Sequence, residues 1–151
     1  MNTAGDVNGD GYADFLVSAY GQDTIYLFFG AVGVEDSADL SSADAQLIGE
    51  LEGDEVGDAV ASGAGDFNGD GLDDLAVGVQ GASTNAAYMI LAPVSGSLGL
   101  GTAALKVVKG GGDHVGWAGD LNADGLDDFA FIGVSNGQVA LLLGPGVIVP
   151  D

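Results

Sequence analysis

The chain lacks cysteine and arginine entirely, and its only basic residues are Lys106 and Lys109. Without cysteine there can be no disulfide framework and no metal site built on thiolates. Against the two lysines stand 23 Asp and Glu residues, which give a formal net charge of −21. A surface of this charge repels nucleic-acid phosphates and anionic lipid, so we expect neither as a partner.

Long apolar runs and helical periodicity are also missing. No segment reaches the roughly 18 consecutive apolar residues of a membrane span, so membrane insertion is not expected. The chain opens without a basic stretch followed by an apolar one, so it contains no predicted signal peptide. Residues 41–46 are expected to form at most a turn. The length of 151 residues and the 47% hydrophobic content are sufficient for a folded core.

What the sequence does contain is one acidic nine-residue loop in three copies, which start 60 and 54 residues apart. The copies read DVNGDGYAD, DFNGDGLDD and DLNADGLDD. Oxygen ligands at positions 1, 3, 5 and 9 suit Ca²⁺, which takes about 6–8 oxygens, and the glycine at position 6 permits the sharp turn around the ion. The predicted side-chain ligands are Asp6, Asn8, Asp10 and Asp14; Asp66, Asn68, Asp70 and Asp74; and Asp120, Asn122, Asp124 and Asp128. The position-7 carbonyls of Tyr12, Leu72 and Leu126 are predicted to complete the shell.

Other interpretations of the loop are weaker. Asp, Asn and Gly are ordinary turn residues, but three copies in one register argue against a plain turn. An EF-hand or dockerin loop needs an acidic ligand at position 12, where this chain has Val17, Val77 and Phe131. The nonapeptide β-helix repeat is contiguous, whereas these copies are widely spaced. Asp73 and Asp127, at position 8, are expected to be outer-shell or solvent groups.

Short apolar runs with strand preferences follow each loop, so the chain is predicted to be all-β. The 28 glycines suit tight hairpins and close backbone contacts. The expected strands cover residues 15–19, 24–29, 45–49, 60–64, 75–79, 86–91, 104–108, 129–133, 138–143 and 147–149.

The loops and strands together resemble the FG-GAP repeat of the integrin α-subunit β-propeller and its bacterial relatives. The carrying motifs are AGDVNGDGYADFLV at residues 4–17, AGDFNGDGLDDLAVG at 64–78, AGDLNADGLDDF at 118–129 and FFGA at 28–31. The resemblance implies four-stranded propeller blades, with each calcium loop joining the first and second strands of a blade. A single repeat domain is expected over 1–151, with blades at about 1–50, 51–110 and 111–151.

The sequence departs from the family pattern in two ways. Gly57 lies nine positions before Asp66, but the corresponding Gly116 lies only four before Asp120, so the first strand of the third blade is expected to be truncated. Propellers close with about 4–8 blades, so three cannot form a ring. An open arc exposes apolar surface and strand edges. We therefore expect a homodimer that closes a six-bladed propeller; the alternative is a fragment of a larger propeller protein.

Catalytic interpretations find little support. Residues 133–137 match the G-x-S-x-G nucleophile elbow, but strand-forming residues follow, Asn-Gly favours a hairpin, and His114, the single histidine, precedes the motif. His114 is predicted to be a loop side chain, and Trp117 to pack rather than stack on sugar. No carboxylate pair can be placed at glycosidase spacing.

The sequence therefore favours a non-enzymatic binding, adhesion or assembly module in which Ca²⁺ is structural, with an unidentified protein or glycan ligand. Extracellular calcium modules bind with Kd of about 10⁻⁴–10⁻³ M, which favours an extracellular or cell-surface location. The alternative is an accessory propeller fragment of a larger extracellular hydrolase.

Overall fold

The computed structural model describes residues 1–19, 21–33, 39–54, 56, 62–63, 65–80, 85–103, 105–109, 114–133, 138–145 and 147–148. Within these ranges the all-β prediction is confirmed. The helical elements described are a 3₁₀ turn at Leu40–Ser42 and the single-turn helix α1 at Leu100–Ala103. Neither is long or apolar enough to cross a membrane.

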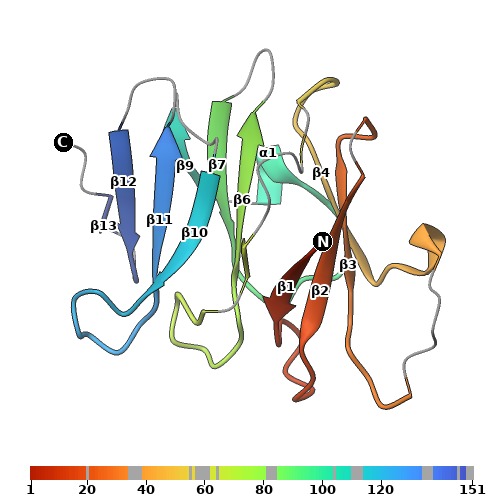
Figure 1. Ribbon diagram of the computed structural model, residues 1–151, viewed down its shortest axis with the longest axis horizontal. Helices are drawn as coiled ribbons and strands as arrows, with labels where there is room; N and C mark the ends of the chain where they lie inside the picture. Colours follow the sequence, from red (N-terminus) through yellow and green to blue (C-terminus); the bar gives the residue numbers. More distant parts are fainter. Residues whose placement is uncertain are drawn as a thin grey trace.

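The strands form three open sheets that stand in a row (Figure 1). The first sheet has the order β1-β2-β3-β4-β8, the middle sheet β5-β6-β7-β9 and the third sheet β10-β11-β12-β13. The first contains β1 (Asn2–Gly5), β2 (Asp14–Ala19), β3 (Thr24–Phe28), β4 (Ala45–Ile48) and β8 (Gly96–Gly99); the middle β5 (Ser62–Gly63), β6 (Leu75–Gln80), β7 (Asn85–Ile90) and β9 (Leu105–Lys109); and the third β10 (His114–Gly119), β11 (Asp128–Gly133), β12 (Gln138–Leu143) and β13 (Val147–Ile148).

Each sheet is an antiparallel meander, except for one strand that crosses over. The strand β8 comes from the segment between β7 and β9, yet it pairs in parallel with β4 of the first sheet. Its residues Gly96–Gly99 have little strand preference, and sequence analysis did not predict a strand there. The pairing covers the outer edge of the first sheet with a segment that belongs, in chain order, to the middle one. It ties the two sheets together.

The first strand of the third sheet is complete, so the expectation of a truncated strand was wrong. The strand β10 runs for six residues, from His114 to Gly119, and pairs with β11 through five residue pairs. The error came from taking Gly116 as the counterpart of Gly57. The chain enters the strand two residues earlier, at His114, so Gly116 lies in its interior.

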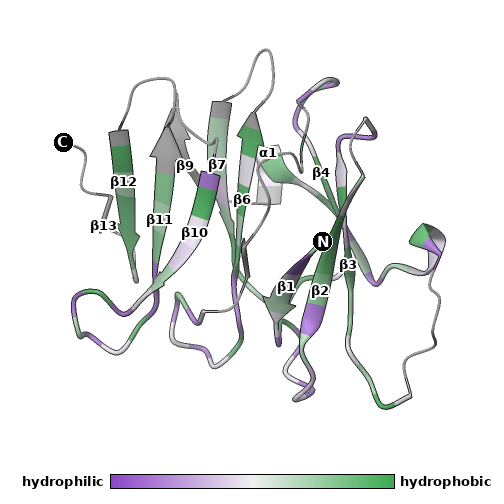
Figure 2. Cartoon of the chain, viewed as in Figure 1, coloured by the Kyte–Doolittle hydropathy of each residue, from purple (hydrophilic) through white to green (hydrophobic). Residues whose placement is uncertain are grey.

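The core lies between the sheets and divides into two clusters. One cluster joins the first and middle sheets, and the second joins the middle and third sheets. Alternate residues of β6 and β7 enter opposite clusters: Leu75 and Tyr88 face the first sheet, whereas Ala76 and Met89 face the third. The middle sheet is therefore buried on both faces, and Figure 2 shows correspondingly apolar strands above polar lower loops.

The third sheet is buried on one face only. In β12, Leu142 is fully buried against the middle sheet, whereas Leu141 and Val139 point the other way and are 40% and 59% exposed. In β11, Phe129 and Phe131 enter the same cluster as Leu142. The outer face of this sheet therefore presents apolar side chains without a covering sheet in the described part of the chain.

This alternation predicts opposite outcomes for two neighbouring leucines. The substitution Leu142→Ala should lower the free energy of unfolding by about 2–5 kcal/mol, because it opens a cavity between two sheets. The substitution Leu141→Ala should cost less than about 1 kcal/mol, because that side chain is half exposed. Urea unfolding monitored by circular dichroism measures both, and equal losses would contradict the assigned faces.

Candidate metal centre

The three acidic loops lie side by side along one edge of the molecule, the lower edge in Figure 1. Each joins the first and second strands of its sheet: β1 to β2, β5 to β6 and β10 to β11. The strands are apolar and paired, whereas the loops carry Asp, Asn and Gly, so the chain turns at the same place in every sheet. The predicted ligands of each loop are therefore together at one end of one sheet.

Within a loop, the side chains at positions 1, 3 and 5 bind the loop's own backbone. In the first loop, the Asp6 carboxylate accepts hydrogen bonds from the N–H groups of Gly9, Asp10 and Gly11 at 2.8–3.1 Å. Asn8 Oδ1 accepts from Asp10 N–H and Asp10 Oδ1 accepts from Tyr12 N–H, both at 2.9 Å. The second loop repeats all five bonds, and the third repeats all but the one to its position-4 N–H.

The aspartate at position 9 is buried in all three loops and acts as a clasp. In the first loop, Asp14 Oδ2 accepts from Val7 N–H at 2.9 Å, and Oδ1 accepts from Gly30 N–H at 2.8 Å. Because Gly30 follows β3, the carboxylate joins the loop to the far end of the third strand. Such bonds are needed, since burying a carboxylate without partners is costly. Asp74 binds Phe67 and Ala92 in this way, and Asp128 binds Leu121 and Gly144.

Two of the buried position-9 aspartates, Asp74 and Asp14, have a raised pKa. Burial raises the pKa of Asp74 to about 6, with further increases from the Asp70 and Asp66 carboxylates, while N–H groups of Ala92 and Phe67 act in the opposite direction. Burial also raises the pKa of Asp14, and Asp10 and Asp6 add to it. Each of these two loops thus concentrates negative charge that a cation would neutralise.

The donor set fits a hard cation by chemistry. Each loop provides three carboxylates, an amide oxygen and a backbone carbonyl, which are the ligands that Ca²⁺ takes. In this structure the oxygens accept hydrogen bonds instead, including Asn8 Nδ2 to Asp10 Oδ2 at 2.9 Å. No group of three or more His, Asp or Glu side chains among the described residues is arranged to hold a metal ion. Binding would therefore need rearrangement of the loop side chains, and the ligand assignments stay predictions.

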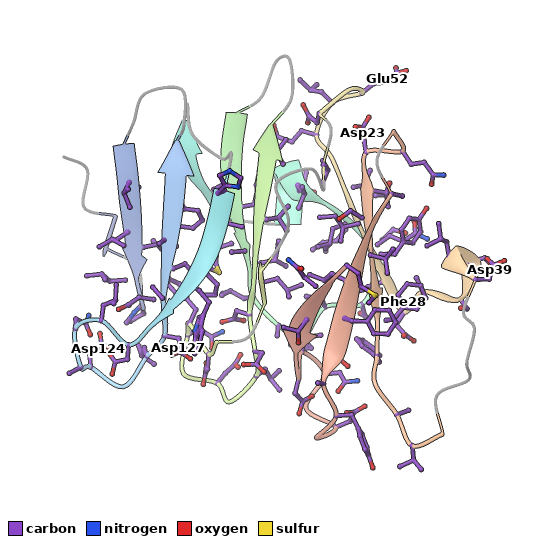
Figure 3. The ribbon with its side chains drawn as sticks, viewed as in Figure 1. Asp23, Phe28, Asp39, Glu52, Asp124 and Asp127 are labelled. Atoms are coloured by element: carbon purple, nitrogen blue, oxygen red, sulfur yellow. The ribbon has the colours of Figure 1, made fainter. Side chains whose placement is uncertain are left out.

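The aspartates at position 8 connect neighbouring sheets, a role that sequence analysis missed. Asp73 Oδ2 accepts from Asp6 N–H at 2.7 Å, and Asp73 N–H donates to Asp6 C=O at 3.1 Å. The same pair of bonds joins Asp127 to Asp66, at 2.9 and 3.1 Å. Both carboxylates are half-buried and bind the backbone of a neighbouring loop, so they are not plain solvent groups, and the alternative of an outer-shell role stays a prediction. Figure 3 shows Asp127 between the loops of the third and middle sheets.

Two glycines permit this close approach. A Cβ at Gly5 would overlap the Asp73 carboxyl group, and one at Gly65 would overlap the Trp117 ring and approach Asp127. Gly119 has the same place in the third sheet, and no atom of the described residues lies within 4 Å of a Cβ built there. The glycine before each loop was visible in the sequence, but its contact with the next sheet depends on how the sheets stack.

Three other candidates from the sequence are Trp117, His114 and the nucleophile-elbow motif. Trp117 packs over Gly65 of the middle sheet, as the packing interpretation expected, although it is 50% exposed. His114 is an exposed residue in β10, so its placement in a loop was wrong. In the nucleophile-elbow motif, Gly133 ends β11 and residues 134–137 lie outside the described residues.

Two of the three loops lie in segments that match a known repeat family. The FG-GAP repeat family matches residues 2–34 and 59–89, which contain the first and second loops. Human integrin alpha-X is 39% identical over 87 residues, an alignment that covers 54% of this chain and 7% of that integrin. The chain contains an FG-GAP, integrin α-like region. FG-GAP repeats imply propeller blades, and the matched segments contain β1, β2 and β3 of the first sheet and β5, β6 and nearly all of β7 of the middle sheet.

The third sheet extends the FG-GAP pattern beyond the matched residues. Its loop repeats the position-9 clasp through Asp128 and the position-8 bridge through Asp127. It differs at position 4, where Ala123 replaces the glycine and has a φ of 60°. By geometry, the third loop is thus a further copy of the same unit.

The bridge between neighbouring FG-GAP loops predicts different effects at two matched glycines. Gly5 and Gly119 have similar positive φ angles, 77° and 70°, so alanine causes comparable backbone strain of about 1–2 kcal/mol at each. At Gly5 the added Cβ should also displace Asp73, which costs about 1–3 kcal/mol more as Asp6 N–H loses its partner. Thermal unfolding of Gly5→Ala and Gly119→Ala measures the difference, and equal destabilisation would contradict the bridge.

Proposed function

We propose that the acidic loops bind Ca²⁺ and that the chain is part of an integrin-like propeller with a non-enzymatic binding or adhesion role. The observation that carries this proposal is the threefold repeat of one loop whose three carboxylates have few cationic partners. The whole chain has two lysines and no arginine, and both lysines lie in β9 rather than in a loop. A divalent cation is the simplest means to neutralise such loops.

The proposed ligands are those predicted from the sequence. Asp6, Asn8, Asp10 and Asp14 would hold the ion in the first loop, and the equivalent residues would do so in the others. The bound ion would neutralise the carboxylates of its loop, and the chain's own residues would hold the loop in position. A ligand that binds only the folded state stabilises it by RT ln(1 + [L]/Kd), about 1.4 kcal/mol per site at ten times Kd. Three independent sites would contribute about 4 kcal/mol.

The proposed class is non-enzymatic because the FG-GAP region is integrin α-like, and integrin homology points to binding rather than catalysis. We place the module outside the cell, where Ca²⁺ is abundant, and expect a protein or glycan ligand. An accessory propeller of an extracellular hydrolase remains the alternative, and no observation in the structure favours it. Three sheets do not close a ring, so a propeller needs further blades.

Calcium binding is testable through stability. Addition of Ca²⁺ should raise the melting temperature, and excess EDTA should lower it by several degrees, since about 1 kcal/mol corresponds to roughly 2–4 °C for a chain of this size. Isothermal titration calorimetry should give a stoichiometry near three. A melting curve that is identical in Ca²⁺ and EDTA would contradict the structural role of the ion.

A matched pair of charge-neutralising variants locates the sites. The substitution Asp70→Asn removes a predicted ligand and should reduce the calorimetric stoichiometry by one. Asp39→Asn removes a carboxylate that is also exposed, the cap of the Leu40–Ser42 turn, and should leave the stoichiometry unchanged. Equal losses in the two variants would indicate nonspecific attraction of Ca²⁺ to an acidic surface.

A further inference from the structure

Neighbouring sheets meet through a set of contacts that occurs twice, which we call the inter-sheet ladder. Position 8 of each following loop binds the N–H and C=O of position 1 in the preceding loop, as Asp73 does with Asp6. Position 7 packs over position 4: Leu72 Cδ2 lies 2.9 Å from a Cβ built at Gly9, and Leu126 has the same distance from Gly69. Position 2 is buried between the sheets, with Val7 and Phe67 at most 5% exposed.

The third sheet makes the ladder contacts with the middle sheet, but on its other face the corresponding groups have no neighbouring sheet among the described residues. The Asp120 N–H has no acceptor among the described residues, whereas the matching N–H groups of Asp6 and Asp66 are paired. Leu121, at position 2, is 54% exposed. In the strand pairing, Leu141 lies opposite Ala130, so it corresponds to Leu27 of the first sheet, which lies opposite Leu16. Leu27, however, is fully buried against the middle sheet. The exposed groups are thus those that the first two sheets bury against a neighbour.

From this correspondence we propose that the outer face of the third sheet binds a fourth FG-GAP blade whose loop carries a carboxylate at position 8. That carboxylate accepts the Asp120 N–H, and the apolar face of the incoming sheet covers Leu121, Val139 and Leu141. This assignment rests on the proposed propeller and on continuity with the two interfaces inside this chain, and it does not depend on calcium. In Figure 1 this face is the outer side of the end sheet that contains β11 and β12.

By the same correspondence a second copy of this chain is a poorer occupant, so this proposal differs from the homodimer predicted from the sequence, which stays a prediction. The first sheet of a second copy would present Ala13 at position 8, so the Asp120 N–H would meet a methyl group instead of a carboxylate. It would present Tyr12 at position 7, against Ala123, whose Cβ already fills the space that Gly9 and Gly69 leave to a leucine. The occupant that fits has an acid at position 8 and a flexible or small side chain at position 7.

The test adds such a blade and follows single amides. A chain in which a copy of residues 49–110 follows residue 148 supplies a fourth sheet, with the copy of Asp73 at position 8 and with Leu72→Ala in the copy, which gives the small side chain required at position 7. Hydrogen exchange measured by NMR should show the Asp120 amide at least about tenfold slower than in the 151-residue chain. The matched control carries Asp73→Ala in the appended copy alone. It should restore fast exchange at Asp120 and leave the Asp6 and Asp66 amides protected.

Three results would overturn the proposal. One is an Asp120 amide that stays fast although the appended sheet has protected amides of its own. Another is an appended sheet without protected amides, because a surface of this kind must fold the blade that it binds. The third comes from light scattering of the unmodified chain: a mass of two copies, with Asp120 protected, would assign the face to self-association. A monomer with a fast Asp120 amide supports the proposal.

Discussion

The structure depends on aspartate carboxylates that accept hydrogen bonds from main-chain N–H groups. A tight loop leaves its backbone amides without strand partners, and buried amides must be satisfied. Position 9 meets this need within a sheet, where Asp14 joins Val7 to Gly30. Position 8 meets it between sheets, where Asp73 holds Asp6. The same chemistry thus fixes both the turn inside a unit and the stacking of units.

This solution has an electrostatic cost that the chain does not offset with basic residues. Burial raises the pKa of Asp74, and the nearby Asp70 and Asp66 carboxylates add to the effect. Amide hydrogen bonds return part of that energy, since Ala92 and Phe67 stabilise the charged form. A chain with two lysines has few other means of compensation. The loop can therefore fold with these hydrogen bonds, but a cation would neutralise its negative charge more completely. This is the physical reason for proposing Ca²⁺.

Sequence reasoning succeeded where the signal was local. Apolar runs after each loop predicted β2, β6 and β11 to within a residue, because burial on one or both faces demands such runs. It failed where the partner is distant in sequence: β8 is a strand because β4 offers a free edge, and Gly96–Gly99 alone carries no such preference. The bridging role of Asp73 and Asp127 could not be predicted from the sequence either, because it arises only when the sheets stack. The contrast of Ala13 with these two acids was the available clue.

That contrast shows how position in the row shapes each unit. In stacked repeats each unit contacts only its neighbours, so an interior unit must satisfy two interfaces and an outer one only one. The middle sheet conforms at every ladder position, with Gly69, Leu72 and Asp73 all engaged. Departures occur on the two faces that no described sheet covers: Ala13 stands at position 8 of the first loop and Ala123 at position 4 of the third. Position 4 has a positive φ in all three loops, which favours glycine there. At Gly9 and Gly69 a neighbour's leucine also packs on the glycine, so the contact between units adds a second reason for that residue, and alanine occurs in the copy without a described neighbour.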